Sequence, residues 1–250
     1  MNCYLCHESI PEDHSFYRDH EQYVCKTCFK DAPRCFICRF PGKQLETVEG
    51  LGLECEFCRG KMVSEGDNLE ELIDPVMPFI TSFGLAPPEA LRFSWLSLKE
   101  LRAIQTNADL PPESFIDDFL RYCYPVFYQE GTFHCLKRMT KPTFVVYTIV
   151  QLAVADIARS NGLPHLRGQS PFHTFARGYC HFIGFEAARR LEYDLEWRQL
   201  RKWPELGAQG EFERWRNMTR FNSGQKMIAY FQANLGKLAR SYLGQDDEET

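Results

Sequence analysis

Four Cys-x-x-Cys pairs near the start of the chain constrain its fold more than any other feature. Two residues between cysteines let both thiolates of a pair face one tetrahedral site, and two pairs complete a closed four-sulfur shell for Zn²⁺. Eighteen residues separate the first two pairs and sixteen separate the last two, and both gaps suit a zinc-ribbon or knuckle hairpin. We therefore expect two structural zinc ions, with eight ligands: Cys3, Cys6, Cys25, Cys28, Cys35, Cys38, Cys55 and Cys58.

Other uses of paired cysteines fit this chain less well. A disulfide framework needs an oxidising compartment, whereas the first residues are polar and do not resemble a secretory signal. A thioredoxin-like site needs one pair beside a βαβ pattern, not four pairs in about sixty residues. A thiol-rich chain of this kind indicates a cytoplasmic protein.

The cysteine pairs can be grouped in two ways. Consecutive grouping puts the first two pairs on one zinc and the last two on the other, as in a LIM-type double zinc module. Interleaved grouping would give the cross-brace of a RING-type ubiquitin ligase. The connection Phe29–Arg34 between the inner pairs is long for a RING, and this favours the consecutive grouping.

Length and charge exclude several classes of protein. A chain of 250 residues can bury roughly 70–75% of its unfolded surface, enough for a core beyond the zinc module. Its longest apolar run, Phe144–Val150, is far shorter than the roughly 20 residues of a membrane span. The net charge of −5 is spread evenly, without the basic footprint of a nucleic-acid-binding protein. We therefore expect protein partners, and neither nucleic acid nor membrane.

Helical periodicity dominates after residue 62. Apolar residues recur at helical spacing over Leu69–Phe83, Ser97–Glu100 has the form of a capping box, and Phe115–Leu120 suggests another short helix. Phe144–Ile157 is apolar on nearly all sides and predicts a buried helix, although its first half could also be a strand. Asn161-Gly162 would end that helix.

Two further helices complete the expected fold. The spacing from Phe172 to Leu195 predicts a long amphipathic helix, and Ile228–Tyr242 predicts another. The predicted class is α+β, mainly α. We expect three parts: a LIM-like double zinc module with short β-hairpins (1–62), a helical connecting region (63–140) and a helical domain (141–250).

The cysteine-rich segment resembles a known family. Its motifs are Tyr17-Arg18-x-His20, Pro33-Arg34-Cys35-x-x-Cys38 and Leu53-x-Cys55-x-x-Cys58, together with the long gap between Cys28 and Cys35. These are similar to the LIM-like segment of the plant ubiquitin-activated LIM peptidases that restrict organ growth. The plant members have a histidine where this chain has Cys28, and either residue can bind zinc.

A second resemblance to this family lies further along the chain. Arg159–Pro164 and Arg177–Cys180 are similar to the segments that follow its His-Glu-x-x-His helix and contain its Glu-Glu-Gly-x-Cys motif. In that register the two zinc histidines fall on Gln151 and Ala155, and the general-base glutamate falls on Leu152. The Glu-Glu pair that supplies the third ligand falls on Ala176 and Arg177. The resemblance thus implies a degenerate zincin-like domain, that is, a pseudopeptidase.

These replacements remove the chemistry of a zinc peptidase. A catalytic site needs three protein ligands, a metal-bound water and a carboxylate base. Glutamine is at best a weak oxygen donor, alanine donates nothing and arginine repels the cation. We therefore expect no enzyme but a regulatory or interaction protein. By resemblance, its expected partners are ubiquitin-linked proteins or an active family member.

Three alternatives remain open. The first is an active zinc metallopeptidase with a relocated site. The candidate residues are poorly spaced for such a site. His181 and Glu186 lie five apart on one helix, which does not suit sharing a metal, and the adjacent Cys180 and His181 point about 100° apart. The second is a cross-brace zinc ubiquitin ligase, and the third a nucleic-acid-binding protein. The candidates for a relocated site are His134, Cys135, His165, His173, Cys180, His181 and Glu186.

Overall fold

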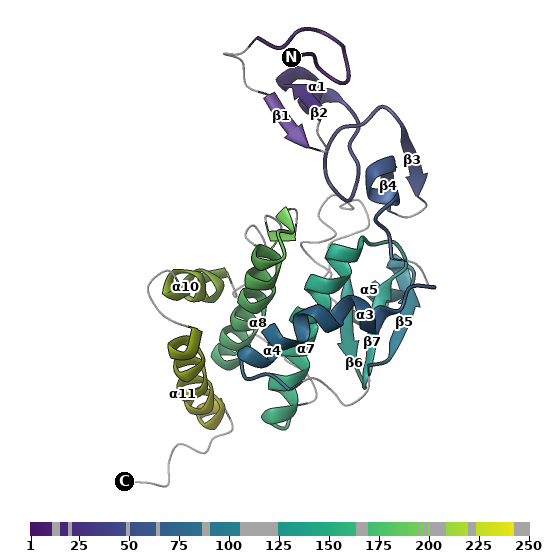
Figure 1. The fold of residues 1–250 in the computed structure, drawn as a ribbon. Helices are drawn as coiled ribbons and strands as arrows, with labels where there is room; N and C mark the ends of the chain where they lie inside the picture. Colours follow the sequence, from purple (N-terminus) through teal and green to yellow (C-terminus); the bar gives the residue numbers. More distant parts are fainter. Residues whose placement is uncertain are drawn as a thin grey trace.

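The computed structural model describes residues 1–11, 16–19, 22–48, 51–63, 66–86, 91–105, 125–163, 170–194, 196–197, 200, 209–219 and 224–242. In Figure 1 a small N-terminal module extends from a larger, mainly helical body. The predicted α+β class with dominant helices and small sheets is confirmed. Five features of the sequence analysis lie outside the described residues: His20, the helix at 115–120, Pro164, His165 and Leu195.

Two antiparallel hairpins, each followed by a short helix, build the N-terminal module. Phe16 pairs with Cys25 in the first hairpin, and Leu45 pairs with Cys55 in the second, so each second strand ends on a cysteine. The module has a small core of its own around Val24 and the cysteines. Its elements are β1 (Phe16–Asp19), β2 (Gln22–Cys25), α1 (Lys26–Asp31), β3 (Leu45–Val48), β4 (Gly52–Cys55) and α2 (Glu56–Arg59).

Short helices open the body, largely where the periodicity predicts them. α3 (Leu69–Ile73), the 3₁₀ turn η1 (Asp74–Val76) and α4 (Met77–Ser82) follow one another directly, and the chain leaves them at Gly84, with φ +70°. The capping box predicted at Ser97 is confirmed at the start of α5 (Leu98–Gln105). The Glu100 carboxylate accepts from Ser97 N at 2.8 Å, and Ser97 Oγ accepts from Glu100 N at 3.3 Å.

A three-stranded sheet lies in the segment 63–140, where only helices were expected. The strand order is β5 (Phe93–Leu96), β7 (Thr132–Leu136), β6 (Val126–Gln129). β6 and β7 form an antiparallel hairpin, while β5 joins β7 in parallel. The tight turn Glu130-Gly131 has positive φ at both residues, which matches the right-handed twist of the two strands.

Two long helices form the centre of the body. α7 (Lys141–Ser160) begins at Thr140, whose side chain caps Thr143 N, and ends at Asn161-Gly162 as predicted. It is helical throughout, so the alternative of a strand in its first half is wrong. α7 is the only helix in the described chain that is long and apolar enough to span a membrane. Most of it is buried in the body, as in the core helix of a globular fold.

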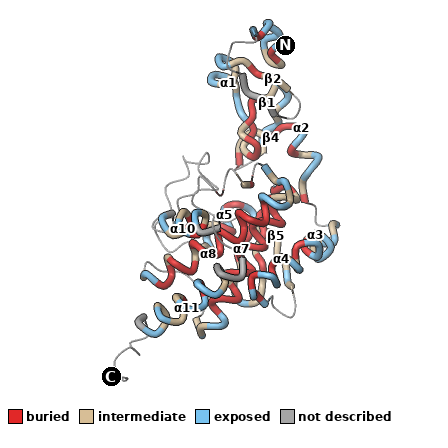
Figure 2. Tube along the Cα trace, turned by 60° about the vertical axis from the view of Figure 1, so that its left-hand side comes forward, coloured by how far each residue is buried: buried red, intermediate tan, exposed pale blue. Residues whose placement is uncertain are grey.

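α8 (Pro171–Arg190) differs from its prediction. The sequence pattern predicts an amphipathic helix reaching Leu195, but fifteen of the twenty residues of α8 are buried and it ends at Arg190. Figure 2 shows the buried residues continuing through α7 and α8. The reason for the difference is that α7, α10 (Gln209–Thr219) and α11 (Gly224–Tyr242) all pack against α8. The sequence pattern did not predict α10.

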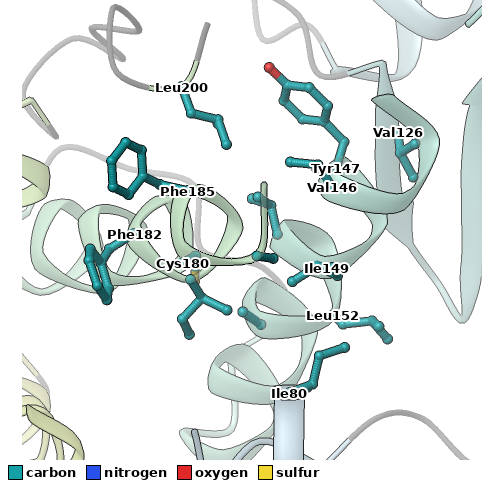
Figure 3. Packing of buried hydrophobic residues seen from close by; sticks show 14 of the residues in the cluster. Ile80, Val126, Val146, Tyr147, Ile149, Leu152, Cys180, Phe182, Phe185 and Leu200 are labelled. Carbon is teal, nitrogen blue, oxygen red and sulfur yellow. The ribbon is translucent and has the colours of Figure 1, made fainter. Parts of the chain in front are cut away.

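Close backbone approach explains two glycines in α8. A Cβ on Gly184 would clash with Val150 Cγ2 of α7, and a Cβ on Gly178 would lie 2.5 Å from Glu211 Cβ of α10. Figure 3 shows residues of both helices in one cluster, among them Ile149 and Leu152 of α7 and Cys180 and Phe182 of α8. One continuous cluster of buried residues joins the segments 63–140 and 141–250, so these two predicted parts pack as one body.

The second half of the module is joined to the body at several points. Val63 N donates to Met139 O at 2.9 Å, and Lys141 N donates to Lys61 O at the same distance, so the chain leaving the module lies beside the start of α7. The buried Glu54 carboxylate lies 3.7 Å from guanidinium nitrogens of both Arg59 and Arg138. Burial raises the pKa of Glu54, and the two arginines oppose this rise.

Candidate metal centres

The first candidate centre consists of Cys3, Cys6, Cys25 and Cys28, whose sulfur atoms all lie within 4.8 Å of one another. Cys3 and Cys6 lie in an N-terminal turn, Cys25 ends β2 and Cys28 lies in α1. Cys25 N donates to Cys3 Sγ at 3.4 Å, and Cys28 N donates to Cys25 Sγ at 3.5 Å. The hairpin therefore brings the second pair of cysteines onto the first.

The second candidate centre consists of Cys35, Cys38, Cys55 and Cys58, again with all sulfur atoms within 4.8 Å. It repeats the first: a turn carries one pair, a strand ends on the third cysteine and a short helix contains the fourth. Cys55 N donates to Cys35 Sγ at 3.4 Å, as Cys25 N does to Cys3 Sγ.

The turns of the two centres are equivalent in detail. His7 and Arg39 directly follow the second cysteine of their turns, and both have positive φ, 64° and 61°. His7 N donates to Cys3 O, and Arg39 N donates to Cys35 O. The structure thus reveals an internal repeat that we did not find in the sequence. The repeat could have been found by aligning the two turns on their first cysteines.

The grouping is consecutive, as the sequence favoured. All eight cysteines are described, and each group contains two pairs that follow one another in the sequence. The interleaved grouping of a cross-brace is therefore not the one that the structure shows. The distance from Cys6 Sγ to Cys25 Sγ is 3.9 Å, and that from Cys38 Sγ to Cys55 Sγ is 3.8 Å. These distances are too long for a disulfide bond of about 2.05 Å. They match the edge of about 3.8 Å of a sulfur tetrahedron with metal–sulfur bonds of about 2.3 Å.

Electrostatics also favour a cation in each group. Burial opposes ionisation of Cys3, but backbone hydrogen bonds, the strongest from Cys25, lower its pKa to about 6. Burial and the neighbouring thiols raise the pKa of Cys28 to about 12. In the second group the Cys38 thiol lowers the pKa of Cys35 to about 7, while Cys35 and its neighbours raise that of Cys58 far above its ordinary value. A divalent cation would relieve this repulsion between thiolates, so each group could hold a metal ion.

The two centres differ in exposure. In the second, all four cysteines are buried, with between 0% and 9% of their surface exposed. In the first, only Cys3 is buried, Cys25 and Cys28 are half-buried and Cys6 is exposed. In Figure 1 the first hairpin and α1, which carry the first centre, lie at the end of the module away from the body. β3 and β4 lie nearer to the body.

The positions aligned with the family's catalytic residues lie on α7 and α8. Gln151, Leu152 and Ala155 are buried in α7, and Ala176 is buried in α8, whereas Arg177 is half-buried. Gln151 Oε1 accepts a hydrogen bond of 3.0 Å from Tyr128 N in β6. These residues therefore belong to the packed interior rather than to either cysteine group.

The candidates for a relocated site are dispersed in the described structure. Cys135 lies in β7, and His173, Cys180 and His181 are buried in α8. His173 Nδ1 lies 2.6 Å from Ser170 Oγ, and the buried Glu186 pairs with Arg189 at 2.8 Å. Burial lowers the pKa of His134 in β7. Among the described residues, histidine, cysteine and carboxylate side chains form no third group close enough to share a metal.

The fold and the centres define an α+β protein with a double tetracysteine module, which fits a double zinc module, and a mainly helical body. Comparison with known proteins does not narrow this class: no family model, curated protein or solved structure matches the chain.

Proposed function

We propose that this protein is a non-catalytic, zinc-binding interaction or regulatory protein, a pseudopeptidase relative of the LIM-containing, ubiquitin-linked metallopeptidases. The observation that carries the proposal is the composition of the two centres. Each group provides four cysteine sulfurs, a donor set that suits zinc and leaves no coordination position for water or substrate. Such ions stabilise a fold and do not activate a nucleophile.

The interior of the body supports the absence of peptidase chemistry. Leu152 and Ala176 are packed in the core, and neither side chain can bind a metal or accept a proton. Gln151 retains a potential ligand atom among the aligned positions on α7, but its oxygen already accepts a hydrogen bond from β6. In this proposal the body provides one surface that binds a protein partner, and the double zinc module provides a second such surface.

The proposed partners follow from the resemblance to the peptidase family. They are proteins, either linked to ubiquitin or active members of that family, rather than nucleic acids or membranes. We also propose a cytoplasmic location, because thiolate metal centres of this kind suit a reducing compartment.

Elemental analysis of protein purified without added metal or chelator tests this proposal. We expect two zinc ions per chain, and one after Cys→Ser substitution of either Cys3 or Cys35. A third zinc that survives both substitutions, together with proteolysis of a casein substrate that a chelator abolishes, would contradict the proposal and favour the relocated metallopeptidase. Protein that binds no zinc would also contradict it.

Binding of purified ubiquitin and of a ubiquitin-conjugating enzyme separates the remaining possibilities. Calorimetric titration of ubiquitin into the zinc-loaded chain should show binding if the partner is recognised through its ubiquitin. Ubiquitin transfer from a charged conjugating enzyme would instead indicate a ligase and overturn the non-catalytic function.

A further inference from the structure

The two tetracysteine centres repeat one local design but differ in their access to solvent. At the equivalent position of each turn, Cys6 is exposed whereas Cys38 is buried. Cys25 and Cys28 of the first centre are also partly accessible, and the corresponding Cys55 and Cys58 are buried. A thiolate held by a metal keeps much of its nucleophilic character, so access by the reagent decides which cysteine reacts.

The centres also differ in their attachment to the body. Leu51 in the second half of the module belongs to the core of the body, and Glu54 lies between Arg59 and Arg138. Cys3, Cys25 and Cys28 of the first centre belong to the small core of the module, as do the cysteines of the second centre, but no described residue of 1–34 belongs to the core of the body. Local opening of the first centre therefore leaves the core of the body intact, whereas the second half of the module contributes Leu51 to that core.

We infer that the first centre is a thiol-modification site at which Cys6 reacts with peroxides and other soft electrophiles, and that this reaction releases the zinc of that centre alone. The second centre keeps its metal under the same conditions because its sulfurs are covered. The inference rests on the proposed zinc binding and adds a regulatory property to it.

The reaction with hydrogen peroxide balances as follows. The Cys6 thiolate attacks one peroxide oxygen, an S–O bond forms and hydroxide leaves, which gives the sulfenic acid. The Cys25 thiolate, with its sulfur 3.9 Å away, then attacks the Cys6 sulfur, and an S–S bond forms as a second hydroxide leaves. Two protons from solvent convert both hydroxides to water. The two sulfurs lose two electrons, and these electrons reduce the peroxide.

This product removes two of the four donors. Only Cys3 and Cys28 remain, too few for a closed tetrahedral shell, and the ion is lost. The turn that carries Cys6 also contacts the second half of the module, where Lys43 Nζ lies 2.6 Å from His7 Nε2 and 5.2 Å from the centre of the Tyr4 ring. Oxidation should therefore also loosen the contact between the two halves.

The test uses the full chain loaded with two zinc ions. Hydrogen peroxide is added in the presence of a chromogenic zinc indicator, and released zinc is followed with time. We expect one zinc per chain to be released at least tenfold faster than the other. Peptide mapping after the fast phase should find Cys6 oxidised and the cysteines of the second centre intact. Equal release rates, or faster loss from the second centre, would overturn the inference.

Matched histidine variants locate the reactive residue. Histidine can replace cysteine as a zinc ligand but does not form a sulfenic acid or a disulfide. Cys6→His should slow the fast release at least tenfold, whereas Cys38→His should leave it unchanged. An unchanged fast release in zinc-loaded Cys6→His would contradict the assignment of Cys6.

A labelling experiment on the natural sequence does not depend on these variants folding. Brief treatment of the zinc-loaded chain with N-ethylmaleimide should modify Cys6 before any cysteine of the second centre, and the reverse order would contradict the inference. The two proposals fail differently. A chain without zinc contradicts the proposed function, whereas a chain with two zincs lost at one rate contradicts only the modification site.

Discussion

Gln151 joins α7 to the edge of the sheet through one side-chain oxygen. Its amide is buried and accepts from Tyr128 N of β6 at 3.0 Å. The side chain of Gln151 therefore makes a structural contact between α7 and the sheet. It provides the acceptor for a partly buried backbone donor of the edge strand β6.

Replacing this glutamine by methionine tests that role. Gln151→Met keeps a similar volume but leaves Tyr128 N without its acceptor, so we expect a loss of about 1–3 kcal/mol in the free energy of unfolding. Urea unfolding followed by tryptophan fluorescence measures the loss, since all four tryptophans lie after residue 62. Gln232→Met, at an exposed position of α11, is the control and should change little. Equal effects of the two substitutions would contradict the assigned contact.

Glu196 is a buried carboxyl group that makes the stability of the body depend on pH. It accepts a hydrogen bond of 2.7 Å from Thr143 Oγ1, and burial raises its pKa above the ordinary value. The folded state thus binds this proton more tightly than the unfolded chain does. The resulting stabilisation is complete below the unfolded-state pKa and is lost as the pH rises through the raised pKa.

Glu196→Gln should remove this dependence. Relative to the variant, the natural body should lose stability as the pH rises from about 4 towards neutrality, because burying the carboxylate costs free energy that the amide does not. Urea unfolding of zinc-free protein at several pH values, again by tryptophan fluorescence, measures the difference. Parallel pH profiles for the two proteins would contradict it.

At the scale of elements, Gly184 sets the distance between α7 and α8. Gly184→Ala would place a methyl group against Val150, and such overpacking typically costs about 1–3 kcal/mol. Gly236→Ala in α11 is the matched control, since its Cβ would meet no atom within 4 Å. The control should be neutral or stabilising by up to about 1 kcal/mol, because alanine favours helix more than glycine. Thermal unfolding followed by circular dichroism compares the two, and a neutral Gly184→Ala would show that the helices can move apart.

Helices could be predicted from the sequence better than strands. The C-terminal end of α7 and the capping box of α5 depend on neighbouring residues, and both were predicted, whereas the start of α7 after Thr140 was not. β5 has four residues and pairs in parallel with β7 across a long stretch of chain, so its pairing has no local signal. The β6–β7 hairpin did have one, namely the alternating residues around Glu130-Gly131. The burial of most of α8 depends on tertiary contacts that local periodicity does not contain.

The candidate site was the most predictable part of the chain. The spacing of the cysteine pairs predicts both groups, because two-residue gaps and hairpin-length connections leave few ways to assemble four sulfurs. The different exposure of Cys6 and Cys38 was not predictable, since it depends on packing within the module that the cysteine spacing does not contain. The contact between Gln151 and β6 could not be predicted either, because the sequence analysis did not predict the sheet.

For the whole molecule, we expect metal removal to unfold the module and to leave the body folded. A structural zinc site contributes about 10–16 kcal/mol to the folding of a small zinc domain, whereas the body has its own large core. We expect excess chelator to unfold residues 1–62 while the tryptophan fluorescence of the body remains native. Limited proteolysis with chelator should then digest the module first. Cooperative loss of both parts would show that the junction at Glu54 couples them fully.

The parallel pairing of β5 with β7 has a consequence for the order of events during synthesis. Each hairpin of the module closes over a short stretch of chain, so the module can assemble on the ribosome soon after its cysteines emerge. β5 must wait until β7 has been translated, and the core helices α7 and α8 follow later still. Chaperones should therefore associate with nascent chains that end between β5 and α8, when the apolar residues of the body have been made but their partners have not.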